Sequence, residues 1–255
     1  MHADDSTRLI DLIRNGERIL VFTGAGISTD SGIPDYRGPN GVWKTRKPVY
    51  YNDFMQNESA RFDYWNYKLE SWIDFGDAAP NAVHNAIFDI EKAGKLLMLV
   101  TQNVDGLHTR AGSSSARLIE IHGTNHEAEC QTCGDRQPAG PIYLQFQKLQ
   151  RIPTCKCGGI LKPATISFGQ SLREGDIDAA FEAARNCDLV ISLGSTLSVN
   201  PAASIPEMAA SQGVPYVIIN RGRTEHDGSP DVTLRIDGSV STIFPKAVKN
   251  ALCAS

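Results

Sequence analysis

Short apolar runs alternate with segments of helical periodicity over most of the chain. Residues 18–23 and 96–100 are rich in apolar and β-branched side chains and have the length of buried strands. Between them, Val83, Ile87 and Ile90 recur at the spacing of one helical face. The same alternation predicts further strands at 188–193, 215–219 and 232–236, and helices near 9–13, 80–94, 176–186 and 203–212. We therefore predict an α/β fold, a Rossmann-like parallel sheet with helices on both faces.

Two insertions interrupt this alternation. Residues 38–76 are rich in aromatic side chains, and residues 125–170 carry a cluster of cysteines. We expect the insertions to form a smaller lobe beside a main domain assembled from residues 1–37, 77–124 and 171–255. Because ligand sites occur preferentially between domains, the cleft between the lobes is the expected site.

Composition and charge narrow the class of protein. The 255 residues carry 25 Lys and Arg against 29 Asp and Glu, a net charge of −4, so no direct nucleic-acid partner is expected. The N-terminal stretch MHADDSTR is polar, and neither a secretory h-region nor a long apolar span follows it. We therefore expect a cytoplasmic protein with no membrane association, in a compartment that keeps thiols reduced.

The cysteines are spaced as in a metal-binding module. Cys130 and Cys133 form C-x-x-C, and after 21 intervening residues Cys155 and Cys157 form C-x-C followed by glycines. Paired cysteines of this kind favour a zinc ribbon with four thiolate ligands. Four protein ligands leave no open position for an activated water, so one structural Zn²⁺ is predicted. The alternative is a set of free or redox-active thiols, and the C-x-C spacing is tighter than usual.

A glycine-broken turn follows the first predicted strand. Gly24 and Gly26 lie where free backbone N–H groups could hold phosphate. The third glycine of the G-x-G-x-x-G fingerprint is missing, which disfavours an ordinary hydride-transferring Rossmann enzyme. A tight strand-to-helix turn without a ligand would look the same in sequence.

Polar side chains follow two further strand-like runs. The segment TQNVDGLH occupies residues 101–108, and His122 comes directly after residues 119–121. A lone histidine is more often structural than catalytic. However, the carboxyl ends of parallel strands line the ligand site in open α/β sheets, so successive polar strand ends indicate one site.

Together these motifs resemble the sirtuins, NAD-dependent protein-lysine deacylases, in their bacterial form. The resemblance rests on GAGISTDSGIPDYRG, TQNVDGLH, the IHGT histidine, the cysteine cluster and Gly194-Ser195-Thr196, and it covers roughly residues 7–250. Some positions depart from the family pattern. Tyr36 stands where Phe is usual, residues 194–196 transpose the usual Gly-Thr-Ser, and Gln170 replaces the usual Glu.

The resemblance implies a reaction and its catalytic residues. The acyl oxygen of a modified lysine would attack the nicotinamide ribose of NAD, nicotinamide would leave, and the acyl group would depart as O-acetyl-ADP-ribose. His122 would be the general base, since a neutral imidazole can accept a ribose hydroxyl proton. Asn103 would orient the ribose and a water, and Asp105 would hold the nicotinamide carboxamide.

The resemblance also implies the remaining NAD contacts. They are Gly24, Ala25, Gly26, Ser28, Ile33, Asp35, Tyr36, Arg37, Gln102, Asn103, Asp105, Gly194, Ser195, Thr196, Asn220, Arg221, Gly222 and Val240. The main domain would then be the NAD-binding domain, residues 38–76 a helical cofactor-loop insertion, and residues 125–170 the zinc-binding module. Two structural readings stay open, because Asp105 could cap a helix and residues 220–222 could be only a turn.

Other histidines compete with His122 for the role of base. His84 lies within a predicted helix and His126 is close to the cysteines, so neither follows a strand as His122 does. We expect His108 to be a solvated residue, the alternative being a supporting position beside the site.

Substrate binding is expected to use backbone pairing. The segments Ser167-Phe168-Gly169 and Ser198-Val199-Asn200 could sandwich an acylated-lysine protein or peptide as an added strand. Sirtuins that remove acidic acyl groups carry Tyr and Arg three residues apart, whereas residues 64–68 (YWNYK) offer no such arginine, which favours deacetylation. The depth of the acyl pocket depends on the packing of the aromatic insertion, which the pattern does not determine.

Two alternatives to a deacetylase remain open from the sequence. One is a protein mono-ADP-ribosyltransferase, which would cleave the same cofactor without an acyl acceptor. The other is a catalytically silent NAD or ADP-ribose sensor, in which His122 and Asn103 have no chemical role.

Overall fold

The main sheet has six parallel strands in the order β3-β2-β1-β7-β8-β9 in a computed structural model of the chain. The structure describes residues 3–38 and 41–253; residues 1–2 of the polar N-terminal stretch and residues 39–40 of the first insertion lie outside the described residues. The strands are β1 (Ile19–Thr23), β2 (Leu96–Thr101), β3 (Leu118–Glu120), β7 (Leu189–Leu193), β8 (Tyr216–Asn220) and β9 (Leu234–Asp237). The strand order reverses between β1 and β7, which confirms the predicted Rossmann-like sheet.

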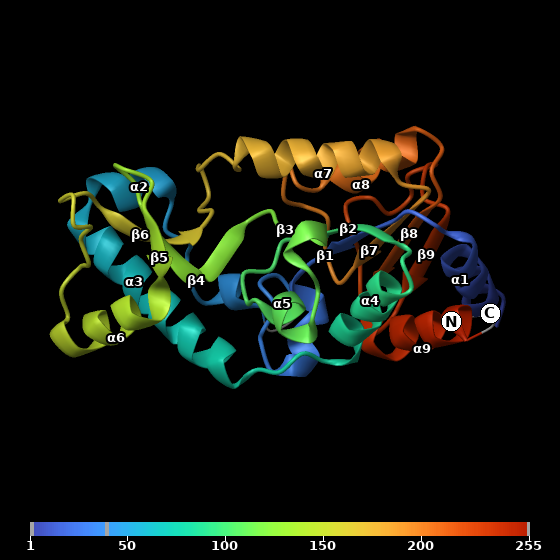
Figure 1. The fold of residues 1–255 in the computed structure, drawn as a ribbon, viewed down its shortest axis with the longest axis horizontal. Helices are drawn as coiled ribbons and strands as arrows, with labels where there is room; N and C mark the ends of the chain where they lie inside the picture. Colours follow the sequence, from blue (N-terminus) through green and yellow to red (C-terminus); the bar gives the residue numbers. More distant parts are fainter. Residues whose placement is uncertain (1–2, 39–40, 254–255) are drawn as a thin grey trace.

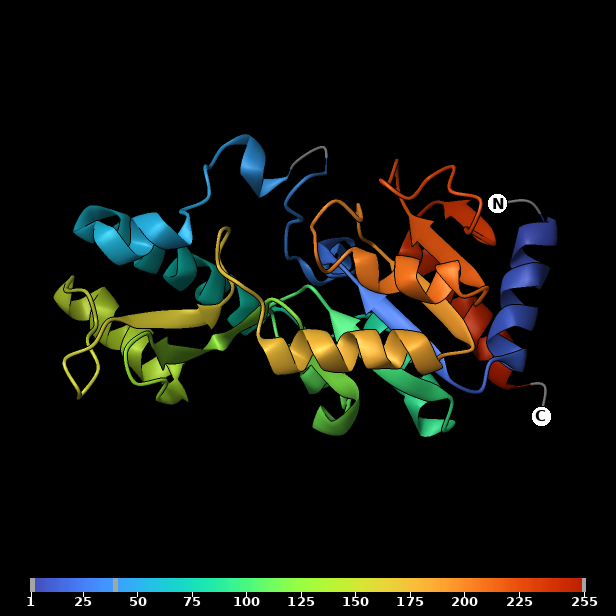
Figure 2. The same cartoon turned by 90° about the horizontal axis from the view of Figure 1, so that it is seen from above.

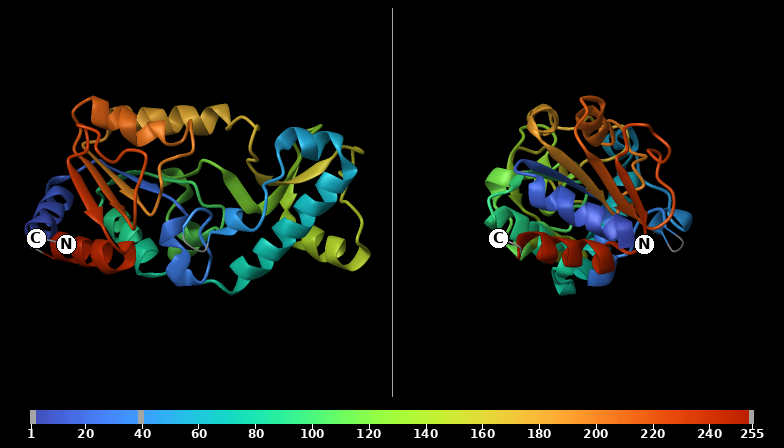
Figure 3. Two further views of the ribbon diagram at one scale, coloured as in Figure 1. Left: turned by 180° about the vertical axis from the view of Figure 1, so that it is seen from behind. Right: turned by 90° about the vertical axis from the view of Figure 1, so that its right-hand side faces the viewer.

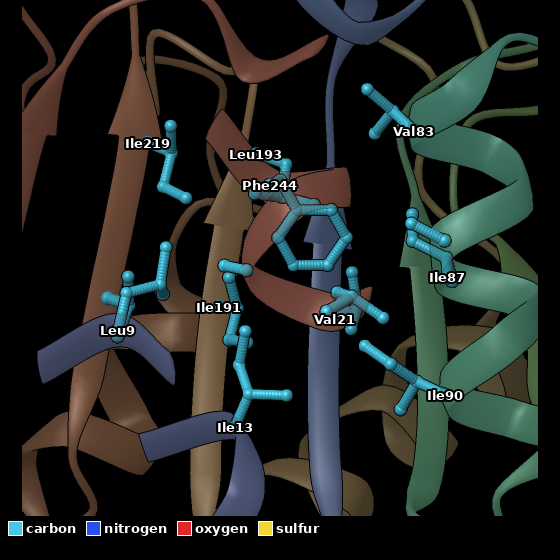
Figure 4. Packing of buried hydrophobic residues seen from close by; sticks show 14 of the residues in the cluster. Leu9, Ile13, Val21, Val83, Ile87, Ile90, Ile191, Leu193, Ile219 and Phe244 are labelled. Carbon is cyan, nitrogen blue, oxygen red and sulfur yellow. The ribbon is translucent and has the colours of Figure 1, made fainter. Parts of the chain in front are cut away.

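Helices cover both faces of this sheet (Figure 1). One face is covered by α1 (Ala3–Asn15), α4 (Ala82–Lys92) and α9 (Val240–Leu252), and the other by α7 (Glu174–Asn186) and α8 (Ser204–Ser211). Figure 4 shows side chains of α1, α4 and α9 packed around Val21 and Ile191. Along β1, Ile19 and Val21 enter this core while Leu20 and Phe22 enter the opposite one, which explains why the run is apolar throughout.

Local sequence signals set the ends of α4. Its N-cap residue, Asn81, accepts a hydrogen bond from the Val83 N–H at 2.9 Å, and Gly94 follows the helix with a left-handed φ of 75°. The sequence pattern missed α9, because Pro245 lies inside it and proline normally argues against a helix interior. Burial of an apolar face that includes Phe244 and Val248 outweighs that local cost.

The small lobe combines an antiparallel sheet with helices that pack against it (Figure 3). Its strands are β4 (Gly123–Cys130), β5 (Arg136–Pro138) and β6 (Leu161–Thr165), and its helices are α2 (Tyr51–Gln56), α3 (Glu58–Asp77) and α6 (Ala139–Leu149). Phe54, Trp65, Tyr143 and Phe146 are fully buried between them. The insertion aromatics therefore supply a core that is separate from the two cores of the main sheet.

Short elements complete the chain. They are α5 (Leu107–Ala111) and 3-10 turns at Ala25–Ile27, Thr29–Ser31, Val42–Lys44 and Ser115–Arg117. Seen from above, residues 41–50 lead into α2 of the small lobe (Figure 2). Among the described residues, no helix combines the length and apolar character that crossing a membrane requires.

Candidate active site

The turns that follow β1 and β7 meet where the strand order reverses. The Gly26 N–H donates to the Gly194 carbonyl at 2.8 Å. A Cβ on either Gly24 or Gly26 would come within 2.8 Å of the same carbonyl, so only glycine allows this approach. Open α/β sheets bind nucleotides in this crevice, outside the carboxyl ends of the strands.

A cleft of about 1460 Å³ extends from these turns to the small lobe. The predicted cofactor contacts that line it are Gly24, Ala25, Gly26, Ile33, Asp35, Tyr36, Arg37, Gln102, Asn103, Gly194, Ser195, Thr196, Asn220, Arg221, Gly222 and Val240. His122 and the substrate candidates Ser167, Phe168, Gly169, Val199 and Asn200 also line it. Ser28, Asp105 and Ser198 are not among the lining residues, and the buried Ser28 and Asp105 lie behind the wall.

Asn103 is held by a buried hydrogen-bond network. Its amide Nδ2 donates to the Ser28 hydroxyl at 3.1 Å and to the Gly24 carbonyl at 3.2 Å. Ser28 in turn donates to Asp105 Oδ2 at 2.8 Å, and Asp105 Oδ1 accepts from the Leu107 N–H at the start of α5. Asp105 therefore binds the first N–H of α5, although the N-cap residue of this helix is Gly106, and it also fixes the residues that orient Asn103.

His122 has the tautomer and charge that a general base needs. Its Nδ1 lies 3.2 Å from the Gln102 carbonyl, which can only accept, so Nδ1 carries the proton and Nε2 keeps a lone pair. Burial lowers the His122 pKa to about 4, with a smaller lowering by Arg37 and an opposing effect of the Gln102 hydrogen bond. The imidazole is therefore neutral at pH 7.

The expectation that His108 is solvated was wrong. Its side chain is buried, Nε2 lies 3.1 Å from Thr23 Oγ1, and the ring centroid is 4.9 Å from that of His84. Burial lowers the pKa of both histidines, that of His84 to about 4. No sequence pattern indicates this contact, because it arises where α5 packs against α4.

The sequence analysis also missed the hydrogen bonds by which Asn81 holds the glycine turn after β1. Asn81 Nδ2 donates to the Ile27 carbonyl at 2.8 Å and to Ser31 Oγ at 2.9 Å while its Oδ1 caps α4. The signal was present, since Asn81 directly precedes the helical periodicity as a cap residue. His126, excluded as a base, contacts the Asp105 carbonyl at 2.9 Å through Nε2.

The late turns are held by their own polar side chains. Ser195 Oγ accepts from Gln102 Nε2 at 2.8 Å and from the Leu197 N–H at 3.1 Å, so this hydroxyl joins the turn after β7 to the turn after β2. Asn220 Nδ2 donates to the carbonyls of Arg221 and Gly222 at 3.1 and 3.2 Å. Residues 220–222 are thus a turn and also part of the cleft wall.

The segment after β6 is anchored on both sides. The Ile166 N–H donates to the His122 carbonyl at 2.7 Å, and the Tyr51 N–H donates to the Phe168 carbonyl at 2.9 Å. Gln170 Oε1 accepts from the Ser167 N–H at 3.1 Å. The side-chain oxygen of Gln170 therefore accepts a hydrogen bond within this loop, as an oxygen of the usual Glu could also do.

The cysteine side chains converge at one end of the small lobe. Their Sγ atoms all lie within 4.8 Å of one another, with Cys130–Cys157 at 3.6 Å and Cys133–Cys155 at 3.8 Å. Tetrahedral Zn–S bonds of about 2.3 Å place sulfurs about 3.8 Å apart, so the donor set fits zinc despite the tight C-x-C spacing. The N–H of Gly159 donates to Cys157 Sγ at 3.4 Å, as thiolate sulfur favours.

Comparisons with known proteins agree with this geometry. The Sir2 family model matches residues 24–201. An NAD-dependent protein deacetylase of Rhodopseudomonas palustris is 39% identical over 231 residues, covering 90% of this chain and 91% of that protein. A solved Sir2 complex with a p53 peptide and NAD+ has a TM-score of 0.86 and 29% identity, covering 97% of this chain and 98% of that one. A Sir2 variant with a deacetylated p53 peptide and 3'-O-acetyl ADP-ribose has a TM-score of 0.86 and 32% identity, covering 95% and 96%.

Proposed function

Because this chain belongs to the Sir2 family, the sirtuins, we propose that it is an NAD-dependent protein-lysine deacetylase. It transfers the acyl group of a modified lysine to ADP-ribose and releases nicotinamide and O-acetyl-ADP-ribose. The names of its relatives and the peptide, NAD+ and acetyl ADP-ribose complexes of its structural neighbours support this activity. The observation that carries the proposal is the neutral His122 imidazole, which lines the cleft together with Asn103 at the reversal of strand order.

NAD would lie across the crevice between the β1 and β7 turns. The N–H groups of Gly24 and Gly26 already donate to backbone carbonyls, which leaves the Ala25 N–H and the Arg37 guanidinium as groups that suit a diphosphate. The Asn103 amide suits a ribose hydroxyl. When bound, NAD supplies the ribose carbon that receives the acyl oxygen as nicotinamide leaves. His122 Nε2 accepts a proton from a ribose hydroxyl, and the Gln102 carbonyl stabilises the imidazolium that forms through its bond to Nδ1–H.

One Zn²⁺ would be held by Cys130, Cys133, Cys155 and Cys157. Four thiolates fill a tetrahedral site and leave no position for water, so the ion stabilises the small lobe and takes no part in the reaction. Thiolate ligands need a reducing compartment, which supports a cytoplasmic location.

Acylated-lysine proteins or peptides are the proposed substrates. The peptide would pair with the backbone of residues 167–169 on one side and 198–200 on the other. Residues 1–37, 77–124 and 171–255 would act as the NAD-binding domain, with residues 38–76 and 125–170 forming the lobe that closes over the substrate. Backbone pairing predicts a broad preference for peptide sequence.

The test is incubation of the zinc-loaded protein with NAD and an acetyl-lysine peptide, followed by mass spectrometry. O-acetyl-ADP-ribose and deacetylated peptide in equal amounts are expected. Nicotinamide released without acetyl peptide, together with ADP-ribosylated protein, would establish the transferase alternative. Recovery of intact NAD from folded protein that binds it would establish the sensor alternative.

A further inference from the structure

A buried lysine lies in β6, the strand that leads into residues 166–170, here called the substrate segment. Lys162 has 1% of its surface exposed, and its Nζ lies 5.2 Å from the centroid of the Tyr64 ring. The Nζ donates to the Thr165 carbonyl and, at 3.4 Å, to the Pro163 carbonyl. Burial lowers the pKa of Lys162 to about 7, and the charge of Glu129 counteracts this only in part. Because burying an ammonium is unfavourable unless hydrogen bonds compensate for the lost water, these carbonyls are what holds Lys162 in place.

The two carbonyls face the free edge of β6. This strand is an outer one in the order β5-β4-β6. The Ile160 carbonyl and the Ile166 N–H both form hydrogen bonds on the side of β4. Backbone groups of successive residues point to opposite sides of a strand, so Pro163 and Thr165 face away from β4. Pro163 has no N–H to donate, which suits an edge without a neighbouring strand. Lys162 therefore supplies a donor to carbonyls for which the sheet offers no partner.

One peptide unit joins this lysine to the active site. The Thr165 carbonyl and the Ile166 N–H belong to the same planar group. Lys162 binds the carbonyl end of that group, and the His122 carbonyl accepts from its N–H end at 2.7 Å. The peptide unit cannot turn without breaking one of these two bonds. Thr165, Ile166 and His122 line the cleft, whereas Lys162 is not among the described residues that line it. The lysine therefore acts on the substrate segment from behind the cleft wall.

We propose that Lys162 is a positioning residue for substrate binding, which holds the Thr165–Ile166 peptide unit in the orientation that the substrate segment needs to pair with a peptide. The inference rests on the proposed deacetylase function and adds a residue outside the cleft on which peptide affinity depends. Without the Nζ donor, the Thr165 carbonyl is left without this partner and the peptide unit is held only at its Ile166 end. The backbone groups offered to the peptide then lose their fixed orientation.

The experiment measures the KM for an acetyl-lysine peptide, kcat and the Kd for NAD on the zinc-loaded full chain. Lys162→Met keeps most of the apolar stem and removes the donor, so the peptide KM should rise by at least about fivefold, as expected for the loss of one buried hydrogen bond. The Kd for NAD should stay that of wild type. A smaller number of folded molecules would instead lower kcat and leave the peptide KM unchanged. Amide hydrogen exchange of residues 163–170, followed by mass spectrometry, should be faster in Lys162→Met than in wild type.

Tyr143→Phe is the matched control, because it removes one fully buried hydrogen bond of the same lobe, 2.7 Å long to Asn125 Oδ1, from a residue that does not line the cleft. Its peptide KM should stay that of wild type even if its melting temperature falls. Lys162→Leu replaces Lys162→Met if the methionine variant does not fold. A wild-type peptide KM in the folded Lys162 variant, or an equal rise in Tyr143→Phe, would overturn the inference and leave the deacetylase intact. Absence of NAD-dependent acetyl removal by wild type would instead defeat the proposed function, and this inference with it.

Discussion

Ser28 and Asp105 are 77 residues apart in sequence, and their side chains form a 2.8 Å hydrogen bond behind the cleft wall. Ser28 lies in the turn after β1 and Asp105 follows β2, so the bond ties two strand ends together. Both side chains are buried, Ser28 with 1% and Asp105 with 4% of their surface exposed. Neither touches the cleft directly, yet together they set the position of Asn103, which does.

Ser28→Ala is predicted to weaken NAD binding without unfolding the chain. The change leaves Asp105 Oδ2 without its Ser28 partner and removes one of the two hydrogen bonds that Asn103 Nδ2 donates, and such a loss costs about 1–3 kcal/mol. We expect the Kd for NAD, measured by calorimetry, to rise by about 5- to 150-fold. Ser211→Ala is the matched control, since the Ser211 hydroxyl bonds the Met208 carbonyl at an exposed position on α8 and the residue does not line the cleft. Wild-type NAD affinity in Ser28→Ala would show that the network does not position Asn103.

The sequence predicted the sheet better than it predicted this network. A continuous apolar run such as residues 96–100 is either a buried strand or a buried helix. Its short length and the preceding Gly94 favour the strand. The contacts of His84 with His108, and of Asn81 with Ile27, depend instead on how α4 and α5 pack after the chain has folded. No periodicity encodes such pairs.

His122→Ala is predicted to lose turnover while keeping NAD and zinc binding. Removal of a general base typically costs a factor of about 10²–10⁴ in rate. The measurement is kcat for acetyl-peptide deacetylation, with NAD affinity and zinc content determined on the same sample. His226→Gln serves as control, because His226 lies outside the cleft against Tyr216. Turnover within a small factor of wild type would remove His122 from the mechanism.

The pH dependence of kcat/KM follows from the lowered pKa of His122. A base must be neutral to accept a proton, and burial lowers its pKa to about 4, below the ordinary value of about 6.5. The pH profile of kcat/KM reflects the pKa values of the free enzyme. The midpoint of its decrease on the acid side should therefore lie well below pH 6.5. We expect little loss of activity between pH 7 and about 5.5. A limb centred near the ordinary histidine value would show that the imidazole is solvated in the active form.

Buried neutral histidines should make the fold sensitive to acid. The pKa of His84 is lowered to about 4 and that of His108 is also lowered, in both cases mainly by burial. Below about pH 6.5 these histidines become protonated in the unfolded chain but stay neutral in the folded chain. The free energy of unfolding therefore falls as pH falls, by up to about 1.4 kcal/mol per pH unit for each such histidine. Above that pH the contribution is constant.

The measurement is thermal unfolding of wild type and His84→Gln at pH 7 and pH 5.5. His84→Gln removes one group that resists protonation, so its melting temperature should drop less between the two pH values than that of wild type. His226→Gln is unsuitable as the comparison because the pKa of His226 is also lowered by burial. Identical drops in wild type and His84→Gln would mean that folding does not lower the pKa of His84.

Removal of zinc should loosen the small lobe and leave the main sheet folded. The cysteine cluster lies at the end of β4 and β6 that is remote from the cleft, since Cys130 pairs with Leu161 there while Thr165, at the other end of β6, lines the cleft. Cys130 and Cys155 are part of the small-lobe core. We expect a chelator to release one zinc per chain, to lower the melting temperature and to expose Trp65, which is fully buried, to solvent. Cys133→Ser should reproduce these effects, whereas Cys253→Ser, outside the cluster, should not. Activity should fall with loss of the folded lobe and return when zinc is restored, and full activity of a metal-free chain would exclude a structural ion at this cluster.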